Sequence, residues 1–311
     1  MDKKSSGEGP NDSQRRNAKR IKKLNDEEDK LNPKHKDVFK EPKEAPMVLP
    51  VMDPDEEDDW GMDIHPNLPQ IGGFGGGSLT ILIGAVKTGK STLISNMFLN
   101  DNFYGQETFD YVKIMSNTIS NDITSRFLKE AYDVDDYYDD AIIAGIIENQ
   151  KKYEKHDQPK IAIIADDLLG SVPRNGLLWS LCSRYRHYNI RQLIISSQNF
   201  RQVSPIARQN CQNLIITSPF PNFKEMLKIA EEFGDVVGGQ KAFLAIYKYA
   251  TPERYNFLHM DLQSNPVKCY KCFNELIAEG QTTYFDMGSV DISEFADGQI
   301  KNEAKPPEKD I

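Results

Sequence analysis

The 311-residue sequence lacks a long apolar run, has few cysteines and shows no apolar leader at its N-terminus. A membrane-spanning helix needs about 20 consecutive apolar residues, and the opening segment MDKKSSGEGP lacks the apolar core of a signal peptide. Four cysteines are too few for a disulfide scaffold in a chain of this length, which favours a reducing compartment. We therefore expect a protein that is neither secreted nor inserted in a membrane.

The first part of the chain also lacks any sustained helical or strand period. Up to about residue 65, Lys, Glu, Asp and Pro dominate, so we expect residues 1–64 to form a disordered, charged arm. The acidic run 53–59 is a solvated linker, a mimic of a phosphate backbone or a site for a basic partner. The arm contains a basic cluster of Arg15, Arg16, Lys19, Arg20, Lys22 and Lys23. This cluster either is solvated, contacts nucleic acid or acts as a localisation signal.

From residue 65 to 265, short apolar runs alternate with helical patterns. Strands that are apolar on both faces and separated by helices are typical of a parallel sheet covered on both sides, so we expect one α/β domain. Two later runs, 243–249 and 255–262, predict an antiparallel hairpin at a sheet edge. We expect residues 266–311 to form a partly disordered C-terminal extension. The expected strands are 79–84, 111–116, 161–166, 191–198 and 213–218, and the expected helices begin at 91 or span 119–132, 139–154, 176–187, 205–210 and 222–233.

The strongest motif is GAVKTGKS, residues 84–91, which lies between a predicted strand and a predicted helix. It fits the phosphate-loop pattern G-x-x-x-x-G-K-[ST] at each fixed position. In this pattern the backbone N–H groups and Lys90 face the β- and γ-phosphates of a nucleotide, and the hydroxyl of Ser91 binds Mg²⁺. Lys87 either adds a second charge there or points to solvent. The predicted ATP-binding residues are Gly84, Ala85, Val86, Lys87, Thr88, Gly89, Lys90, Ser91 and Thr92.

A second motif, IAIIADD at 161–167, is an apolar strand that ends in two carboxylates. In phosphate-loop enzymes a strand-terminal Asp holds the Mg²⁺ shell, which suits Asp166, and a following acid orients or deprotonates the attacking water, which suits Asp167. The second acid favours hydrolysis over transfer to a small molecule. The alternative is two carboxylates that simply face solvent.

A third motif, IISSQN at 194–199, brings Ser197 and Gln198 to the carboxyl edge of the predicted sheet. A polar residue at that place can sense the γ-phosphate and position water, so Gln198 is the third catalytic candidate. Alternatively, Gln198 caps the next turn.

The motifs occur in a definite order: HPNLP (65–69), GAVKTGKS, ADD (165–167), RHYNIRQLIISSQ (186–198) and SPIARQN (204–210). In this order and spacing, over roughly residues 65–262, the sequence resembles the poxvirus-type genome-packaging ATPases of large DNA viruses, in the FtsK-HerA superfamily of P-loop NTPases. The resemblance implies an additional-strand, RecA-like fold with sheet order 5-1-4-3-2. It also implies a ring of subunits that drives double-stranded DNA into a capsid with ATP.

The same resemblance assigns roles to individual positions. Gly84, Gly89, Lys90 and Ser91 match the phosphate loop, Asp166 and Asp167 the metal and base positions, and Gln198 the sensor. Lys87 and Thr88 depart from the small residues that relatives often carry in this loop.

A hydrolytic ring ATPase usually needs a cation from the neighbouring subunit. The candidates for this arginine finger are Arg208 and Arg186, with Arg184, Arg191 and Arg201 behind them; each is alternatively a surface or DNA-facing arginine. Cys269 and Cys272 form a C-x-x-C pair. The pair is half of a zinc site, a redox motif or simply two ordinary thiols.

The sequence therefore predicts a Mg²⁺-dependent ATPase that packages viral DNA as a homo-oligomeric ring. Its expected partners are duplex DNA and a capsid or portal protein, and its expected location is the virion or the host cytoplasm. The alternatives are a cellular or mobile-element DNA pump or helicase of the same superfamily, or a scaffold whose assembly is gated by ATP. Residues 64–290 carry 22 Lys/Arg and 24 Asp/Glu, so a DNA-binding pore would have to be locally basic or assisted by the arm.

Overall fold

A computed structural model describes residues 64–72, 76–119, 126–168, 170–220, 222–293 and residue 295. The described residues belong to one compact unit, Glu56–Ile311. The basic cluster, the acidic run 53–59 and all but the last residue of the predicted arm lie outside the described residues. In the part of the chain that is described, no helix is both long and apolar enough to cross a membrane.

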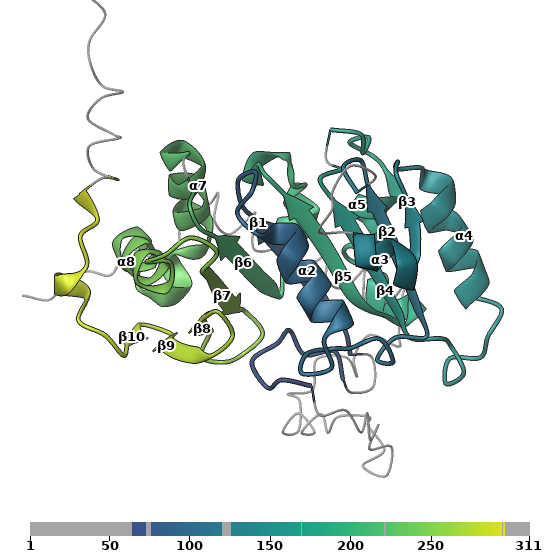
Figure 1. Ribbon diagram of the computed structural model, residues 1–311, viewed down its shortest axis with the longest axis horizontal. Coiled ribbons are helices and arrows are strands. Elements are labelled where there is room, and N and C mark those ends of the chain that lie inside the picture. Colours follow the sequence, from purple (N-terminus) through teal and green to yellow (C-terminus); the bar gives the residue numbers. More distant parts are fainter. Residues whose placement is uncertain are drawn as a thin grey trace, which may run out of the picture. The chain divides into compact units, whose positions relative to one another are not determined.

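The strands and helices follow one another along the chain in a largely alternating order (Figure 1). The strands are Ser78–Ile83 (β1), Tyr111–Ser116 (β2), Asp133–Asp135 (β3), Ile161–Asp166 (β4), Ile190–Ser197 (β5), Asn213–Thr217 (β6), Phe257–Asp261 (β7), Lys268–Lys271 (β8), Glu275–Glu279 (β9) and Thr282–Thr283 (β10). The α-helices are Lys90–Leu99 (α2), Arg126–Ala131 (α3), Asp140–Gln150 (α4), Leu177–Leu181 (α5), Pro205–Gln209 (α6), Phe223–Phe233 (α7) and Gln240–Ala250 (α8). The 3₁₀ turns are Tyr185–Tyr188 (η2), Phe200–Gln202 (η3), Asp235–Val237 (η4) and Met287–Ser289 (η5).

These strands form one mixed sheet in the order β10-β9-β8-β7-β6-β1-β5-β4-β2-β3. From β6 to β3 all neighbours are parallel, whereas β7 pairs antiparallel with β6 and the following strands continue antiparallel. The carboxyl ends of β1, β2, β4, β5 and β6 therefore meet at one edge of the sheet, which is the edge where ligands bind in open α/β sheets.

The five predicted parallel strands correspond to β1, β2, β4, β5 and β6, and their order β6-β1-β5-β4-β2 fits the expected 5-1-4-3-2 arrangement. The full sheet nevertheless differs from the predicted one, because β3 extends it beyond β2 and four antiparallel strands extend it beyond β6. Strands β8, β9 and β10 lie in the segment 266–311 that we assigned to the C-terminal extension, and they continue the same sheet.

The predicted hairpin of 243–249 with 255–262 is wrong. Residues 243–249 lie within helix α8, and only the second segment is a strand, β7. Phe243, Ile246, Tyr247 and Ala250 are all buried, and their spacing of three to four residues places them on one helix face. In the short segment 243–249, consecutive apolar residues resemble the pattern of a strand that is buried on both faces.

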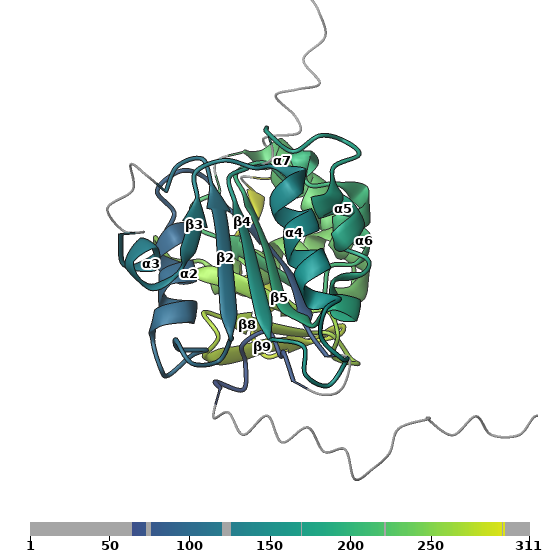
Figure 2. The same ribbon diagram turned by 90° about the vertical axis from the view of Figure 1, so that its right-hand side faces the viewer.

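Helices cover both faces of the sheet, so the sheet lies between two apolar layers (Figure 2). On one face, Leu79, Ile81 and Ile83 of β1 pack into a cluster with residues of α4, α5, α6, α7 and α8. On the other face, Leu82 joins a cluster with Ile94, Met97 and Phe98 of α2 and with a residue of α3. Burial of such a side chain contributes about 1.5–3 kcal/mol, so the two layers hold β1 and the loop that follows it in a fixed place.

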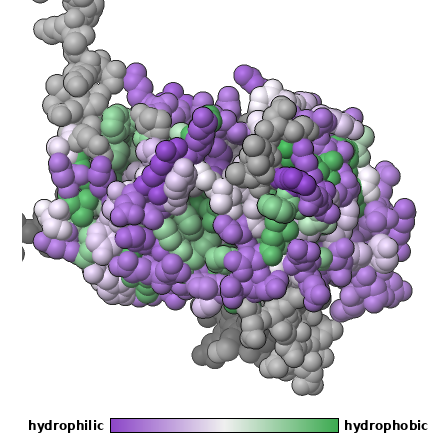
Figure 3. All heavy atoms as spheres, in the orientation of Figure 1, coloured by the Kyte–Doolittle hydropathy of each residue, from purple (hydrophilic) through white to green (hydrophobic). Residues whose placement is uncertain are grey.

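The described surface is mainly polar on the face that Figure 3 shows, with smaller apolar areas among the hydrophilic residues. Several large apolar side chains are exposed, among them Val86, Phe127 and Tyr255. Exposed apolar residues of this kind are normal in folded proteins, and only those that line a cavity call for a chemical account.

Candidate functional site

The phosphate-loop segment connects β1 to α2 at the carboxyl edge of the sheet. Gly84 lies so close to β6 that an added Cβ would stand 1.7 Å from Oγ1 of Thr217, and Gly89 has a left-handed φ of 92°. Both positions therefore require glycine. Thr88 is buried, donates 2.8 Å to the carbonyl of Ala85 and lies 2.7 Å from Thr217 Oγ1, so its hydroxyl ties the loop to the end of β6.

Lys90 is the first residue of α2, and its side chain is buried beneath the loop. Its Nζ donates 2.8 Å to the carbonyl of Gly84 and 3.2 Å to that of Ala85. Burial lowers the pKa of Lys90 from its usual value, and the charges of Asp167 and Asp166 act in the opposite direction. The two carboxylates thus help to keep the ammonium group charged inside the loop.

Asp166 ends β4 and lies in the interior of the same edge, with 7% of its surface exposed. Ser116, at the end of β2, donates 3.2 Å to Asp166 Oδ2, while Oδ1 is buried and has no hydrogen-bond partner among the residues that the structure describes. Burial raises the pKa of this carboxyl. An orphaned carboxylate oxygen is costly unless something binds it, and Mg²⁺ prefers oxygen ligands of this kind. Asp166 and the hydroxyl of Ser91 face one cavity, so the residues present fit a magnesium ion.

Asp167 and Gln198 are held together across the sheet edge. Gln198 Nε2 donates 2.6 Å to Asp167 Oδ2, and the backbone N–H of Asp167 donates 3.0 Å to the carbonyl of Ser196. Asp167 adopts a left-handed φ of 52°, a conformation that Asp and Asn tolerate better than most residues. This conformation turns the Asp167 carboxylate toward Gln198, instead of continuing the strand.

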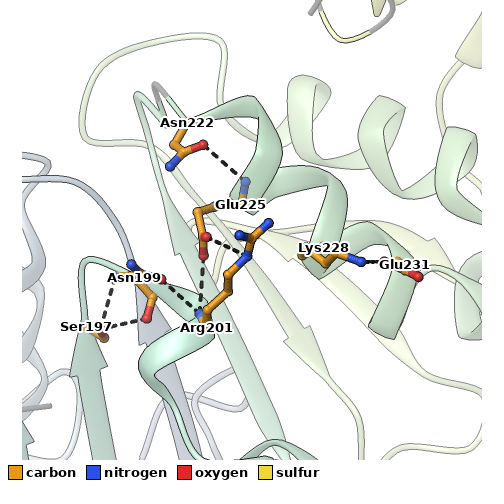
Figure 4. Close-up of polar contacts among 7 residues, drawn as sticks. All are labelled: Ser197, Asn199, Arg201, Asn222, Glu225, Lys228 and Glu231. Atoms are coloured by element: carbon orange, nitrogen blue, oxygen red, sulfur yellow. Dashed lines mark hydrogen bonds and ion pairs between the residues drawn. The ribbon is translucent and has the colours of Figure 1, made fainter. Parts of the chain in front are cut away.

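The segment after Gln198 is anchored to helix α7 by a chain of polar contacts (Figure 4). Asn199 N–H donates 3.0 Å to Ser197 Oγ, and Asn199 Oδ1 accepts 3.0 Å from the N–H of Arg201. The Arg201 guanidinium Nε lies 3.0 Å from Oε1 of Glu225, a buried residue near the start of α7. The N–H of Glu225 donates 3.3 Å to the Asn222 cap. Arg201 therefore ties the end of β5 to helix α7.

One cavity of about 570 Å³ collects most of the predicted site residues. Its walls come from the phosphate loop, the start of α2 and the ends of β4 and β5, together with three residues that the sequence did not single out. The lining residues are Val86, Lys87, Gly89, Lys90, Ser91, Thr92, Thr118, Asp166, Asp167, Gln198, Arg254 and Tyr255. The loop, the acidic pair and Gln198 are thus close enough to act on one ligand.

Thr118, Arg254 and Tyr255 are the missed residues. Thr118 follows β2, and its place just beyond a buried strand is a signal that the sequence carries for it. Arg254 and Tyr255 lie in the turn between α8 and β7, whereas the hairpin prediction placed Tyr255 at the start of its second strand and Arg254 just before that strand. Arg254 Nη2 donates 3.2 Å to the carbonyl of Lys87, so this turn contacts the phosphate loop directly.

The two arginine-finger candidates lie away from this cavity. Arg208, on α6, pairs with Glu232 at 3.1 Å and has its guanidinium carbon 4.9 Å from the centre of the Phe200 ring. Arg186 lies in η2, before β5 begins, whereas Gln198 follows the end of β5. The eight residues of β5 separate the two ends by roughly 26 Å. A finger that acts on a neighbouring subunit has to lie far from its own site, so both residues remain predictions for that role.

The other candidates have local partners. Arg184 donates 3.2 Å to Ser180 Oγ, and Arg191 Nε donates 2.5 Å to Asn189 Oδ1. Cys269 is buried in β8, and burial raises the pKa of its thiol to about 12, while Cys272 lies in the turn that follows. Among the described residues, no group of three or more His, Cys, Asp or Glu side chains is arranged to hold a metal ion.

The sequence matches no protein-family model and no curated protein sequence. Solved structures that resemble it include the genome packaging NTPase B204 of Sulfolobus turreted icosahedral virus 2 in complex with ATP-gammaS, at 21% identity over 63% of this chain and 97% of B204, with a TM-score of 0.43. B204 of Sulfolobus turreted icosahedral virus, described as a DNA-packaging ATPase, is 21% identical over 62% of this chain and 97% of its own, with a TM-score of 0.45. EssC (ATPases 2 and 3) of Geobacillus thermodenitrificans is 14% identical over 50% of this chain and 34% of EssC, with a TM-score of 0.37.

Proposed function

We propose that this chain is a Mg²⁺-dependent ATPase that moves double-stranded DNA into a viral capsid as a homo-oligomeric ring. The observation that carries the ATPase activity is the convergence of the phosphate loop, Asp166, Asp167 and Gln198 on one cavity. The order of the motifs in the sequence supports the proposed role in DNA packaging, and the B204 proteins are named for the same role.

The phosphate loop binds the triphosphate of ATP. Backbone N–H groups of residues 84–91 and the N-terminus of α2 surround the β- and γ-phosphates, and Lys90 neutralises their charge. Lys90 then exchanges its contacts with the carbonyls of Gly84 and Ala85 for phosphate oxygens. Ser91 and Asp166 would hold Mg²⁺, which would supply charge stabilisation on the phosphate oxygens when bound.

Asp167 and Gln198 act on the attacking water. Asp167 accepts the proton of that water as its oxygen attacks the γ-phosphorus, and the bond to the leaving ADP oxygen breaks. Gln198, held 2.6 Å from Asp167 Oδ2, orients the water and reports whether a γ-phosphate is present. Arg208 or Arg186 of a neighbouring subunit completes the site by stabilising charge that develops in the transition state.

The experiment that tests this proposal is the rate of ATP hydrolysis with and without linear duplex DNA. A packaging motor hydrolyses ATP faster when duplex DNA is present, and Lys90→Ala abolishes both rates. A helicase would respond more to a forked duplex, and an ATP-gated scaffold would show a low rate that no DNA changes. No hydrolysis by the wild-type protein under any of these conditions would refute the proposal.

A further inference from the structure

One wall of the cavity has no part in the chemistry described above. It is formed by Arg254 and Tyr255, in the turn between α8 and β7. The Tyr255 side chain is 57% exposed, and its backbone has a left-handed φ of 72°. The turn is fixed by hydrogen bonds from Tyr255 N–H to the carbonyl of Ser218 (3.3 Å) and from Asn256 N–H to the carbonyl of Glu253 (3.2 Å). A bulky residue held in an uncommon conformation at a cavity is a feature that often marks a functional site.

The aromatic ring lies directly against the phosphate loop. An added Cβ on Gly89 would stand 3.2 Å from Cδ1 of Tyr255, so the ring edge packs on the residue that immediately precedes α2. The Arg254 guanidinium carbon is 4.9 Å from the centre of the Tyr255 ring, and Arg254 Nη2 donates 3.2 Å to the carbonyl of Lys87. Arg254 thus braces the ring on one side and the loop on the other.

The order of the sheet places this ring opposite the acidic pair. Strand β1 leads into the loop; β5 and β4, which bring Gln198, Asp166 and Asp167, lie on one side of it, and β6 and β7 lie on the other. If the γ-phosphate points toward the acids and the water, the nucleoside leaves the loop toward β6 and β7. Tyr255 lies on that side, two residues before β7 begins.

We propose that the ring of Tyr255 is the stacking platform for the nucleobase of the bound nucleoside triphosphate, and that Arg254 positions this ring against the loop. The assignment rests on the proposed nucleotide binding and adds a base-recognition residue to it. Stacking needs only the face of an aromatic base, so this contact strengthens the binding of any nucleoside triphosphate without reading hydrogen-bonding groups.

The test compares a ligand that has a base with one that has none. Dissociation constants for ATP and for inorganic tripolyphosphate are measured with Mg²⁺ by isothermal titration calorimetry on the full chain and its variants. In Tyr255→Ala we expect the affinity for ATP to fall roughly 5- to 150-fold, since stacking on an aromatic side chain is worth about that factor. The affinity for tripolyphosphate should stay within about twofold, because the loop and Lys90 are unchanged.

Three further variants make the test specific. Tyr255→Phe keeps the ring and should bind ATP within about twofold of wild type. Tyr255→Leu keeps apolar bulk but has no aromatic face, so it should lose ATP affinity as Tyr255→Ala does. Tyr137→Ala removes another exposed tyrosine, 52% exposed in the turn after β3, and should change neither dissociation constant.

The outcomes separate the two proposals. If wild-type protein binds neither ATP nor tripolyphosphate, the proposed nucleotide binding fails. If wild-type protein binds both but Tyr255→Ala and Tyr255→Leu retain full ATP affinity, the stacking role of Tyr255 fails while nucleotide binding stands. Parallel loss of both ligands in both variants would also overturn the stacking role, because it would show that Tyr255 supports the loop and not the base.

Discussion

Replacing Asp167 by Asn separates catalysis from binding at this site. The substitution keeps the side-chain volume, and Asn adopts the left-handed φ of 52° found here as readily as Asp. Gln198 Nε2 can still donate to the amide oxygen, so the contact that measures 2.6 Å in the wild-type protein is preserved. What the variant loses is the negative charge and the ability to accept a proton from water.

The expected effect is large on hydrolysis and small on affinity. Loss of a general base typically costs 10²- to 10⁴-fold in rate, which corresponds to about 3–5 kcal/mol of barrier. Nucleotide binding should persist, because Lys90, Ser91 and Asp166 are unchanged. Steady-state phosphate release gives the rate, and calorimetry with ATP gives the affinity.

The matched control is Asp136→Asn, an exposed acid in the turn after β3, which should change neither quantity. Retention of more than about a tenth of wild-type turnover in Asp167→Asn would refute its role as the base. Loss of ATP binding to the same extent as turnover would instead assign the metal position to Asp167 and exchange its role with that of Asp166.

The remaining predictions concern assembly, pH and the N-terminal arm. Arg208→Ala and Lys90→Ala subunits, each inactive alone, should regain part of the ATPase activity when mixed, because an intact loop on one subunit then meets an intact arginine on its neighbour. If only mixtures of Arg186→Ala with Lys90→Ala regain activity, Arg186 is the finger. If neither mixture regains activity although mixed rings form, catalysis in trans is refuted. Desolvation lowers the pKa of buried His259 to about 4, whereas the pKa of an unfolded His is near 6.5. The unfolded chain therefore binds the proton more readily than the folded chain. The stability that neutral His259 contributes is full above about pH 6.5 and is lost as the pH falls through about 4. Urea unfolding from pH 7 to 4 should therefore show wild type losing up to about 3 kcal/mol more than His259→Gln, and parallel curves would show that His259 is not buried in its neutral form. Removal of residues 1–60, whose composition favours no packed core, should leave the thermal transition unchanged, and a lower melting temperature would show that this segment packs on the domain.

The parallel sheet and the phosphate loop were predictable because their signals are local. An apolar run such as IAIIAD at 161–166 is buried throughout in β4, and GAVKTGKS lies where a strand and a helix meet, as the pattern requires. Asp166, which ends β4, and Gln198, which follows the end of β5, face the same cavity because parallel strands end at a common edge.

Helix α8 and the cavity wall after it were not predictable in the same way. In FLAIYKY at 243–249, Leu244 and Ala245 are buried as well as Phe243, Ile246 and Tyr247, because the helix packs against both α7 and the antiparallel strands. Five consecutive buried residues hide the helical period in so short a window. Once that segment was interpreted as a strand, Arg254 fell in the connection of a hairpin and Tyr255 became the first residue of its second strand. Their contacts with Lys87 and Gly89 join positions far apart in the chain, which no local pattern encodes.

The most direct test of the account is whether the protein moves along duplex DNA at the expense of ATP. A third strand bound to one end of a linear duplex is displaced when a translocating motor reaches it, and the displacement can be followed by fluorescence. The account predicts ATP-dependent displacement by the wild-type protein and none by Asp167→Asn, although both bind ATP. Hydrolysis of ATP by the wild-type protein without displacement of the third strand would contradict the central claim.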